Sequence, residues 1–217
     1  MNEFCQDRDL LGLEPGLFLS LGPTGSQLIA RSDGQLSGTT FTSASADFTA
    51  AGVQAGMVLT VTTTIPSEGR AYEIVAVDSA QQLTVSVLRA DASAPPIAPP
   101  AAANLSFRVI TYQVQIHRIS DALAEKLRAL AEAAPVAAEA HVDSAQLCQT
   151  AAYGAAASVL LAKAESPGLT DPNWAKAERY QQDFTRMQMQ LRLAIDADGD
   201  GFAERTRTLG NVTLRRT

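Results

Sequence analysis

The sequence is poor in the residues from which most active sites are built. Its two cysteines, Cys5 and Cys148, lie far apart and show no CxxC spacing, so we expect two reduced thiols, with a disulfide as the alternative. Its two histidines, His117 and His141, lie in no HExxH or HxH pattern, which argues against a zinc site or a histidine general base. No serine lies in a G-x-S-x-G turn. These absences predict that the chain is not an enzyme.

Long basic runs and long apolar runs are also missing. Arg215-Arg216 is the longest Lys/Arg run and the net charge is −6, whereas a domain that grips nucleic acid usually carries a basic patch. The longest uncharged helical stretch, residues 144–162, is diluted by polar side chains, so we expect no membrane span. The first sixteen residues include acidic ones and no apolar run of signal-peptide length. We therefore expect a soluble protein of the cytoplasm, or of a particle assembled there.

Residues 25–119 have the pattern of a β domain. Short apolar or alternating segments are separated by turns rich in glycine and aspartate, and the strand candidates are residues 27–31, 39–43, 58–62, 71–77, 83–88 and 105–116. Strands this short at this spacing predict a small antiparallel barrel or sandwich. Residues 90–104 hold four prolines and many alanines, which predicts an exposed loop that joins neither a sheet nor a helix.

Residues 120–196 have the pattern of a three-helix antiparallel bundle. The apolar spacing changes to three and four from Ser120, which predicts helices over 120–134, 143–165 and 172–195. The second helix is alanine-rich and almost uncharged, so neighbouring helices can approach it closely. Asp171 and Pro172 supply an N-cap and a first helical residue for the third helix. Its apolar stripe is predicted to consist of Trp174, Ala177, Tyr180, Phe184, Met187, Leu191 and Ile195.

The two ends of the chain complete the expected α+β fold. Residues 1–24 predict a short helix that docks on the bundle. Residues 197–217 predict a C-terminal β hairpin or tail, with strands 205–209 and 212–216 joined across Gly210-Asn211. The β domain is thus expected to be inserted between the N-terminal helix and the bundle.

One segment could hold a metal ion. Asp196, Asp198 and Asp200, followed by Gly201, match the first half of an EF-hand calcium loop, but position twelve is Arg207 instead of the bidentate glutamate. An Asp/Gly turn at a helix end is the main interpretation, and weak calcium binding is the alternative. The segment 22–26 resembles a phosphate loop only superficially, because no Gly-Lys-Ser/Thr follows. No cofactor is expected.

Three features of the helical half resemble a known family. These are the alanine-rich run 151–161, the amphipathic run 177–184 that continues to Leu191 and Ile195, and the turn 198–201. Together they resemble the head–tail adaptor (connector) proteins of tailed bacteriophages, in which a small helical bundle docks beneath the portal ring. The resemblance covers residues 120–201. The β domain departs from the mostly helical minimal adaptor.

The resemblance implies a mechanical function in the virion, assembled in the host cytoplasm. About twelve copies would form a homo-oligomeric ring that binds the portal protein and the tail or its stopper and terminator proteins. DNA would pass through the lumen without specific binding, and no membrane would be involved. The alternative is a tail or baseplate module whose β domain binds a partner or host glycan. That alternative predicts exposed aromatic residues on the β domain, whereas the aromatic residues there mostly occupy core-like positions; they are Phe41, Phe48, Tyr72, Phe107 and Tyr112. A hydrolase using the aspartates of residues 196–200 would lack a nucleophile and base.

Overall fold

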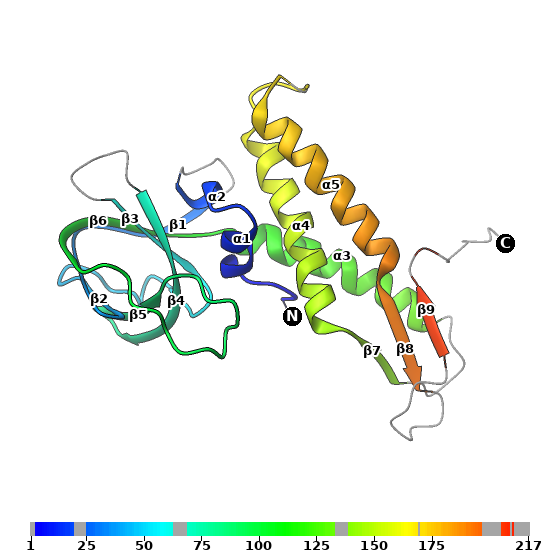
Figure 1. Cartoon of the computed structure of the whole chain (residues 1–217), viewed down its shortest axis with the longest axis horizontal. Helices are drawn as coiled ribbons and strands as arrows, with labels where there is room; N and C mark the ends of the chain where they lie inside the picture. Colours follow the sequence, from blue (N-terminus) through cyan, green and yellow to red (C-terminus); the bar gives the residue numbers. More distant parts are fainter. Residues whose placement is uncertain are drawn as a thin grey trace. The chain divides into compact units, whose positions relative to one another are not determined.

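The chain forms two compact units, of which one is a β-barrel and the other is helical (Figure 1). The computed structural model describes residues 3–19, 25–62, 69–132, 139–168, 170–196, 205–208 and 210. The barrel unit spans Gln6–Gln113, and the helical unit consists of Val114–Thr217 together with Met1–Cys5. The predicted α+β class, with a small antiparallel barrel ahead of three helices, is confirmed.

Six strands close the barrel in the order β1-β2-β5-β4-β3-β6, and every neighbouring pair is antiparallel. The strands are β1 (Ser26–Ser37), β2 (Thr40–Thr42), β3 (Val58–Thr62), β4 (Gly69–Ser79), β5 (Gln82–Ser86) and β6 (Ala102–Thr111). Closure leaves no barrel strand with an open edge. This geometry selects the barrel over the sandwich among the two folds that the strand pattern predicted.

Three phenylalanine rings fill the centre of the barrel. Phe41 packs edge-on against Phe107 with ring centroids 4.8 Å apart, and Phe48 lies 5.9 Å from Phe107. Gly34 lies against these rings, where a Cβ atom would come within 2.8–3.0 Å of Phe41 and Phe107. The register of β1 against β6 shifts on both sides of Gly34. A glycine there lets the bulged strand pass close to the aromatic core.

Two short helices, α1 (Asp7–Leu13) and α2 (Gly16–Leu19), belong to the barrel unit and contact β3 and β4. Their buried apolar side chains include Leu10, Leu17 and Phe18, each at most 1% exposed. α1 and α2 therefore belong to the barrel unit, and docking of residues 1–24 on the helical bundle stays a prediction. Only residues up to Cys5 belong to the helical unit, where Phe4 N donates to Ser120 Oγ. Residues 20–24 lie outside the described part of the chain.

The helical unit contains α3 (Gln113–Glu132), α4 (Ser144–Lys163) and α5 (Pro172–Gln190). Asp143 caps α4 by accepting from two backbone N–H groups, and Asp171 caps α5 in the same way with Pro172 in the first turn, as predicted. α4 and α5 pack against each other with opposite directions (Figure 1). Gln146 near the start of α4 donates to the carbonyl oxygen of Gln190 at the end of α5. The short link between these helices therefore gave the correct antiparallel pairing.

The end of β6 and the start of α3 differ from the prediction, because the alternating pattern of the strand was extended into the helix. The strand predicted over 105–116 ends at Thr111, and α3 begins at Gln113, whose N–H donates to Thr111 Oγ1. From there the buried positions follow helical spacing, at Gln115, Ile116, Ser120 and Leu123. The proline-rich stretch 90–104 is also more ordered than predicted, since Ile97 bridges to Val87 and β6 starts at Ala102.

A three-stranded sheet, in the order β7-β8-β9, replaces the end of the predicted third helix. Its strands are β7 (Glu139–Val142), β8 (Arg192–Asp196) and β9 (Arg205–Thr208). The predicted C-terminal hairpin is not seen in the described part of the chain, where β9 pairs with β8. Residues 211–217 lie outside the described residues. β7 was not predicted, and its pairing with β8 explains why α5 stops at Gln190.

Candidate functional site

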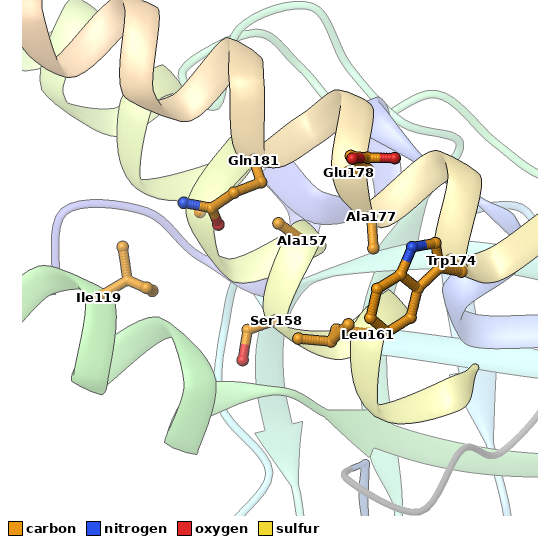
Figure 2. Close-up of a pocket in the computed structure, with 9 residues that line it drawn as sticks. Ile119, Ala157, Ser158, Leu161, Trp174, Ala177, Glu178 and Gln181 are labelled. Carbon is orange, nitrogen blue, oxygen red and sulfur yellow. The ribbon is translucent and has the colours of Figure 1, made fainter. Parts of the chain in front are cut away.

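An apolar groove of about 440 Å³ opens on the helical unit, where α3, α4 and α5 meet (Figure 2). α3 contributes one lining residue and the other two helices contribute four each. The lining residues are Ile119, Gly154, Ala157, Ser158, Leu161, Trp174, Ala177, Glu178 and Gln181. All of them except Ile119, which was assigned to the end of the β domain 25–119, come from the residues predicted to form the helical bundle.

The groove exists because α4 carries little side-chain bulk. Gly154 lies under the ring of Phe184, where a Cβ atom would be 2.9 Å from two ring carbons. Ala157 and Ala177 are 3% and 4% exposed and form the floor between the two helices. Larger side chains at these positions would fill the space or separate α4 from α5. Small residues therefore produce both the close helix pair and the hollow beside it.

The walls of the groove are apolar and open to solvent. Leu161 is 50% exposed and Trp174 is half-buried, and Figure 2 shows both side chains at one end of the hollow. Glu178, Ser158 and Gln181 are exposed at the rim. Glu178 is the one ionisable side chain among the described lining residues. The character of the groove suits an apolar side chain of a protein partner.

A second, shallower hollow continues along α5 towards its C-terminal end. The residues lining it are Gln181, Gln182, Thr185, Arg186, Met189 and Gln190. Met189 is 57% exposed. Arg186 pairs with Asp183 one turn earlier at 2.6 Å and keeps 67% of its side chain exposed. α5 thus presents a continuous surface from Trp174 to Met189.

The barrel unit contains a different cluster, a buried carboxylate between two arginines. Glu73 on β4 is fully buried; one of its oxygens lies 2.7 Å from Arg8 Nε, and the other accepts from Arg89 Nε and from the Arg89 backbone N–H. Arg8 also donates to the carbonyl oxygen of Arg89 at 2.8 Å. Both carboxylate oxygens are occupied by the chain itself. The cluster therefore ties α1 and the segment after β5 to the barrel, and it does not form a ligand site.

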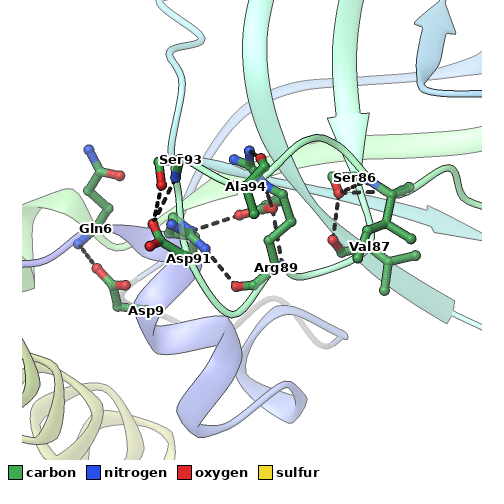
Figure 3. A network of polar contacts seen from close by, with 11 residues as sticks. Gln6, Asp9, Ser86, Val87, Arg89, Asp91, Ser93 and Ala94 are labelled. Carbon is green, nitrogen blue, oxygen red and sulfur yellow. Dashed lines mark hydrogen bonds and ion pairs between the residues drawn. The ribbon is translucent and has the colours of Figure 1, made fainter.

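The segment after β5 is held by further polar contacts (Figure 3). Arg89 Nη1 donates to the carbonyl oxygen of Ala94, and Asp91 Oδ1 accepts from the N–H and hydroxyl of Ser93 at 2.8 and 2.9 Å. These two hydrogen bonds to Ser93 lower the pKa of Asp91 below its ordinary value. Ser86 Oγ accepts from the Ile97 N–H at 2.7 Å. The contacts give order to a stretch whose composition predicted an exposed loop.

Hydrogen bonds to an aspartate also hold the start of the segment between β2 and β3. Asp33 accepts from the Ser43 hydroxyl at 2.6 Å and from the Ser45 N–H at 2.9 Å, which lowers the pKa of Asp33 to about 2. Its neighbours are hydroxyl and amide groups, with no metal ligand among them. The depressed pKa reports a structural hydrogen-bond acceptor.

The residues singled out from the sequence are not gathered into one site. Asp196 is the last residue of β8 instead of following a helix, and Asp198 and Asp200 lie outside the described residues, so calcium binding there stays a prediction. His117 Nε2 lies 2.9 Å from Glu3 Oε1, and His141 lies in β7. Within the described ranges, no three His, Cys, Asp or Glu side chains are grouped to hold a metal ion.

Two other expectations can be compared with the described residues. Neither Cys5 nor Cys148 takes part in a disulfide there. None of the helices that the structure describes is long and apolar enough to cross a membrane. The aromatic residues considered as a binding surface on the β domain are instead buried, at 0–5% exposure; they are Phe41, Phe48, Tyr72, Phe107 and Tyr112.

The groove and the adjoining surface of α5 are therefore the strongest candidate site in the described part of the chain. No protein-family model, curated protein or solved structure matches this chain. Sequence reasoning found the helices that build the groove but missed the groove itself, because Ile119 was assigned to the β domain and not to the predicted helix 120–134.

Proposed function

We propose that the chain is a structural virion protein, a head–tail adaptor whose copies form a ring between the portal and the tail and extend the DNA channel. The observation that carries the proposal is the exposed apolar groove on the small-residue helix pair. Such a surface is costly to leave in water and is typical of a protein that binds another protein. In this proposal the chain catalyses no reaction and needs no cofactor.

The charge of the chain supports the same function. Lys and Arg number 17 against 23 Asp and Glu, which leaves a net charge of −6. Binding to DNA depends mainly on cationic contacts with phosphates, so a conduit without an excess of positive charge lets DNA slide through. The lumen of the proposed ring would therefore contact DNA without specific binding.

The tail or baseplate binding module is the weaker proposal. A glycan- or partner-binding β domain is expected to present aromatic rings at its surface. The aromatic side chains considered for that surface fill the barrel core or lie under α2. The apolar surface that is exposed lies on the helical unit, which favours assembly through the helices.

Native mass spectrometry and negative-stain microscopy test the adaptor proposal. The full chain is purified alone and after co-expression with the portal protein of the phage to which the proposal assigns it. We expect a ring of about twelve copies on the portal. Detection of monomers only, with the portal present, would contradict the proposal. Antibody labelling of purified particles would then locate the protein at the head–tail junction, and labelling elsewhere on the particle would favour the tail-module alternative.

A further inference from the structure

We propose that the groove between α3, α4 and α5 receives the Met189 end of α5 from a neighbouring copy of the same chain. This inference rests on the proposed ring and names the two surfaces that would join its copies. The first surface, the groove, consists of the lining residues given above. The second, which we call the Met189 surface, consists of Gln182, Thr185, Arg186, Met189 and Gln190.

Each of the two surfaces exposes a large apolar side chain. The groove is a hollow with apolar walls, in which Leu161 is half exposed. Met189 is the most exposed large apolar side chain among the described residues, at 57%. Methionine is flexible and adapts to irregular apolar hollows. Insertion of Met189 would therefore remove apolar area of both partners from water at once.

The charges at the rims are complementary. Glu178 is the one charged residue among the described residues that line the groove, and Arg186 is the one charged residue on the Met189 surface. Arg186 uses a single nitrogen for its pair with Asp183. Because a guanidinium group has five N–H donors, Arg186 keeps donors for a second carboxylate. A neighbouring copy's Glu178 is the matching acceptor.

Met189 and Arg186 of one copy cannot reach the groove of the same copy. Glu178 and Arg186 lie on the same helix, about 12 Å apart along its axis at 1.5 Å per residue, and Trp174 and Met189 are about 22 Å apart. Each copy therefore offers a groove at one end of α5 and a Met189 surface at the other. A contact between two different surfaces repeats from copy to copy, and it closes into a ring when the rotation allows.

Two variants test the contact by blocking one surface each. Ser158→Trp fills the groove from an exposed position on α4, and Met189→Asp replaces the inserted side chain with a charge. We expect each variant to weaken association of the full chain by about tenfold or more in analytical ultracentrifugation. Gln149→Trp is the matched control, because Gln149 is exposed on α4 and nine residues before Ser158, which places it on the opposite side of the helix.

Mixing the two blocked variants gives the sharpest outcome. Ser158→Trp keeps its Met189 surface, and Met189→Asp keeps its groove, so an equimolar mixture retains one working contact between unlike copies. We expect a one-to-one dimer and nothing larger by native mass spectrometry. Rings in the mixture, or a wild-type assembly that stops at a two-fold dimer, would overturn the inference.

Charge reversal tests the same contact without changing its shape. Glu178→Arg and Arg186→Glu should each weaken the assembly, and the double variant should restore it. Circular dichroism checks that each variant is folded. If rings persist in Ser158→Trp, Met189→Asp and both charge variants, the inference is wrong while the adaptor proposal stands. If the wild-type chain remains monomeric even with the portal, the adaptor proposal fails, and the contact between copies fails with it.

Discussion

At the scale of single residues, the barrel unit depends on ionic and hydrogen-bonding groups that have been removed from water. Glu73 is fully buried, and the side chains of Arg8 and Arg89 beside it are 10% and 7% exposed. Burying charges costs free energy, which the mutual attraction and the hydrogen bonds offset only when all of them form together. The cluster joins residues from α1, β4 and the segment after β5, so its members hold three parts of the chain in one arrangement.

Replacing Glu73 with glutamine is expected to destabilise the protein strongly. Glu73→Gln keeps the shape of the side chain but leaves two buried guanidinium groups without a counter-charge. Breaking a buried ion pair from one side costs about 3–5 kcal/mol of the free energy of unfolding. Urea denaturation measures the change. Asp78→Asn is the matched control, because Asp78 is an exposed acid on the same strand, and its change should stay within about 0.5 kcal/mol. Equal effects of both substitutions would contradict the role assigned to the cluster.

Tyr112 is expected to ionise at unusually high pH. Burial, and then the negative charge of Asp7, raise the pKa of Tyr112 from 10.0 to about 12, and its hydroxyl donates to the carbonyl oxygen of Leu17 at 2.7 Å. Because the folded state holds the neutral form, the stability that this group contributes is constant below pH 10 and is lost as pH rises towards 12. Tyrosinate absorbance, as the difference between wild type and Tyr112→Phe, should show a midpoint near 12. A midpoint near 10 would show that the ring is in contact with water.

At the scale of elements, small residues decide how α4 and α5 pack. α4 buries alanine and glycine along most of its length, and Gly154 lets the ring of Phe184 lie directly on the α4 backbone. Tyr153 and Tyr180 pack edge-on nearby, with ring centroids 5.6 Å apart. Large residues on α5 thus fit against small ones on α4, and this pairing fixes the width of the groove.

Gly154→Leu is therefore expected to destabilise the helical unit. The added side chain would meet Phe184 at 2.9 Å and Ile119 at 3.0 Å from its first carbon onward. Overpacking of this kind costs about 1–3 kcal/mol, even though leucine favours a helix more than glycine does. Thermal unfolding followed by circular dichroism measures the change. Ser158→Leu, one turn later on the same helix and exposed in the groove, should leave the midpoint almost unchanged. A stabilised Gly154→Leu variant would contradict the close packing.

The elements that the sequence predicted well are those defined by local patterns. The Asp171–Pro172 cap, the alternation in β5 and the glycine-punctuated strands all follow from residues close together in the chain. The errors arise where distant pairing decides the structure. β7 and β8 stabilise each other across the sequence, so residues 192–196, which continue the apolar stripe of α5, become a strand. The cluster around Glu73 could not be predicted for the same reason. Arg8 and Arg89 lie far from Glu73 in the sequence, and no spacing rule connects the three residues.

At the scale of the whole molecule, the two units divide the tasks that the adaptor proposal requires. The barrel unit is closed around a buried aromatic core. The helical unit carries the groove and the Met189 surface, which are the apolar features left open on α4 and α5. The sequence did not indicate that α1 and α2 pack on β3 and β4, because a short apolar helix does not reveal which core will cover it.

The net charge of the molecule leads to the last prediction, which concerns DNA. With a charge of −6, the purified full chain should bind a fluorescein-labelled duplex more weakly than about 10⁻⁴ M at 150 mM salt, the weak limit of ordinary non-specific binding. Fluorescence anisotropy at 50 and 200 mM salt measures the affinity and its salt dependence. The Asp78→Asn variant, which removes one exposed charge of the barrel unit, serves as a control for a small change in charge. Micromolar binding that falls steeply with salt would reveal a cationic surface that releases counterions, and DNA could not then slide freely past the protein.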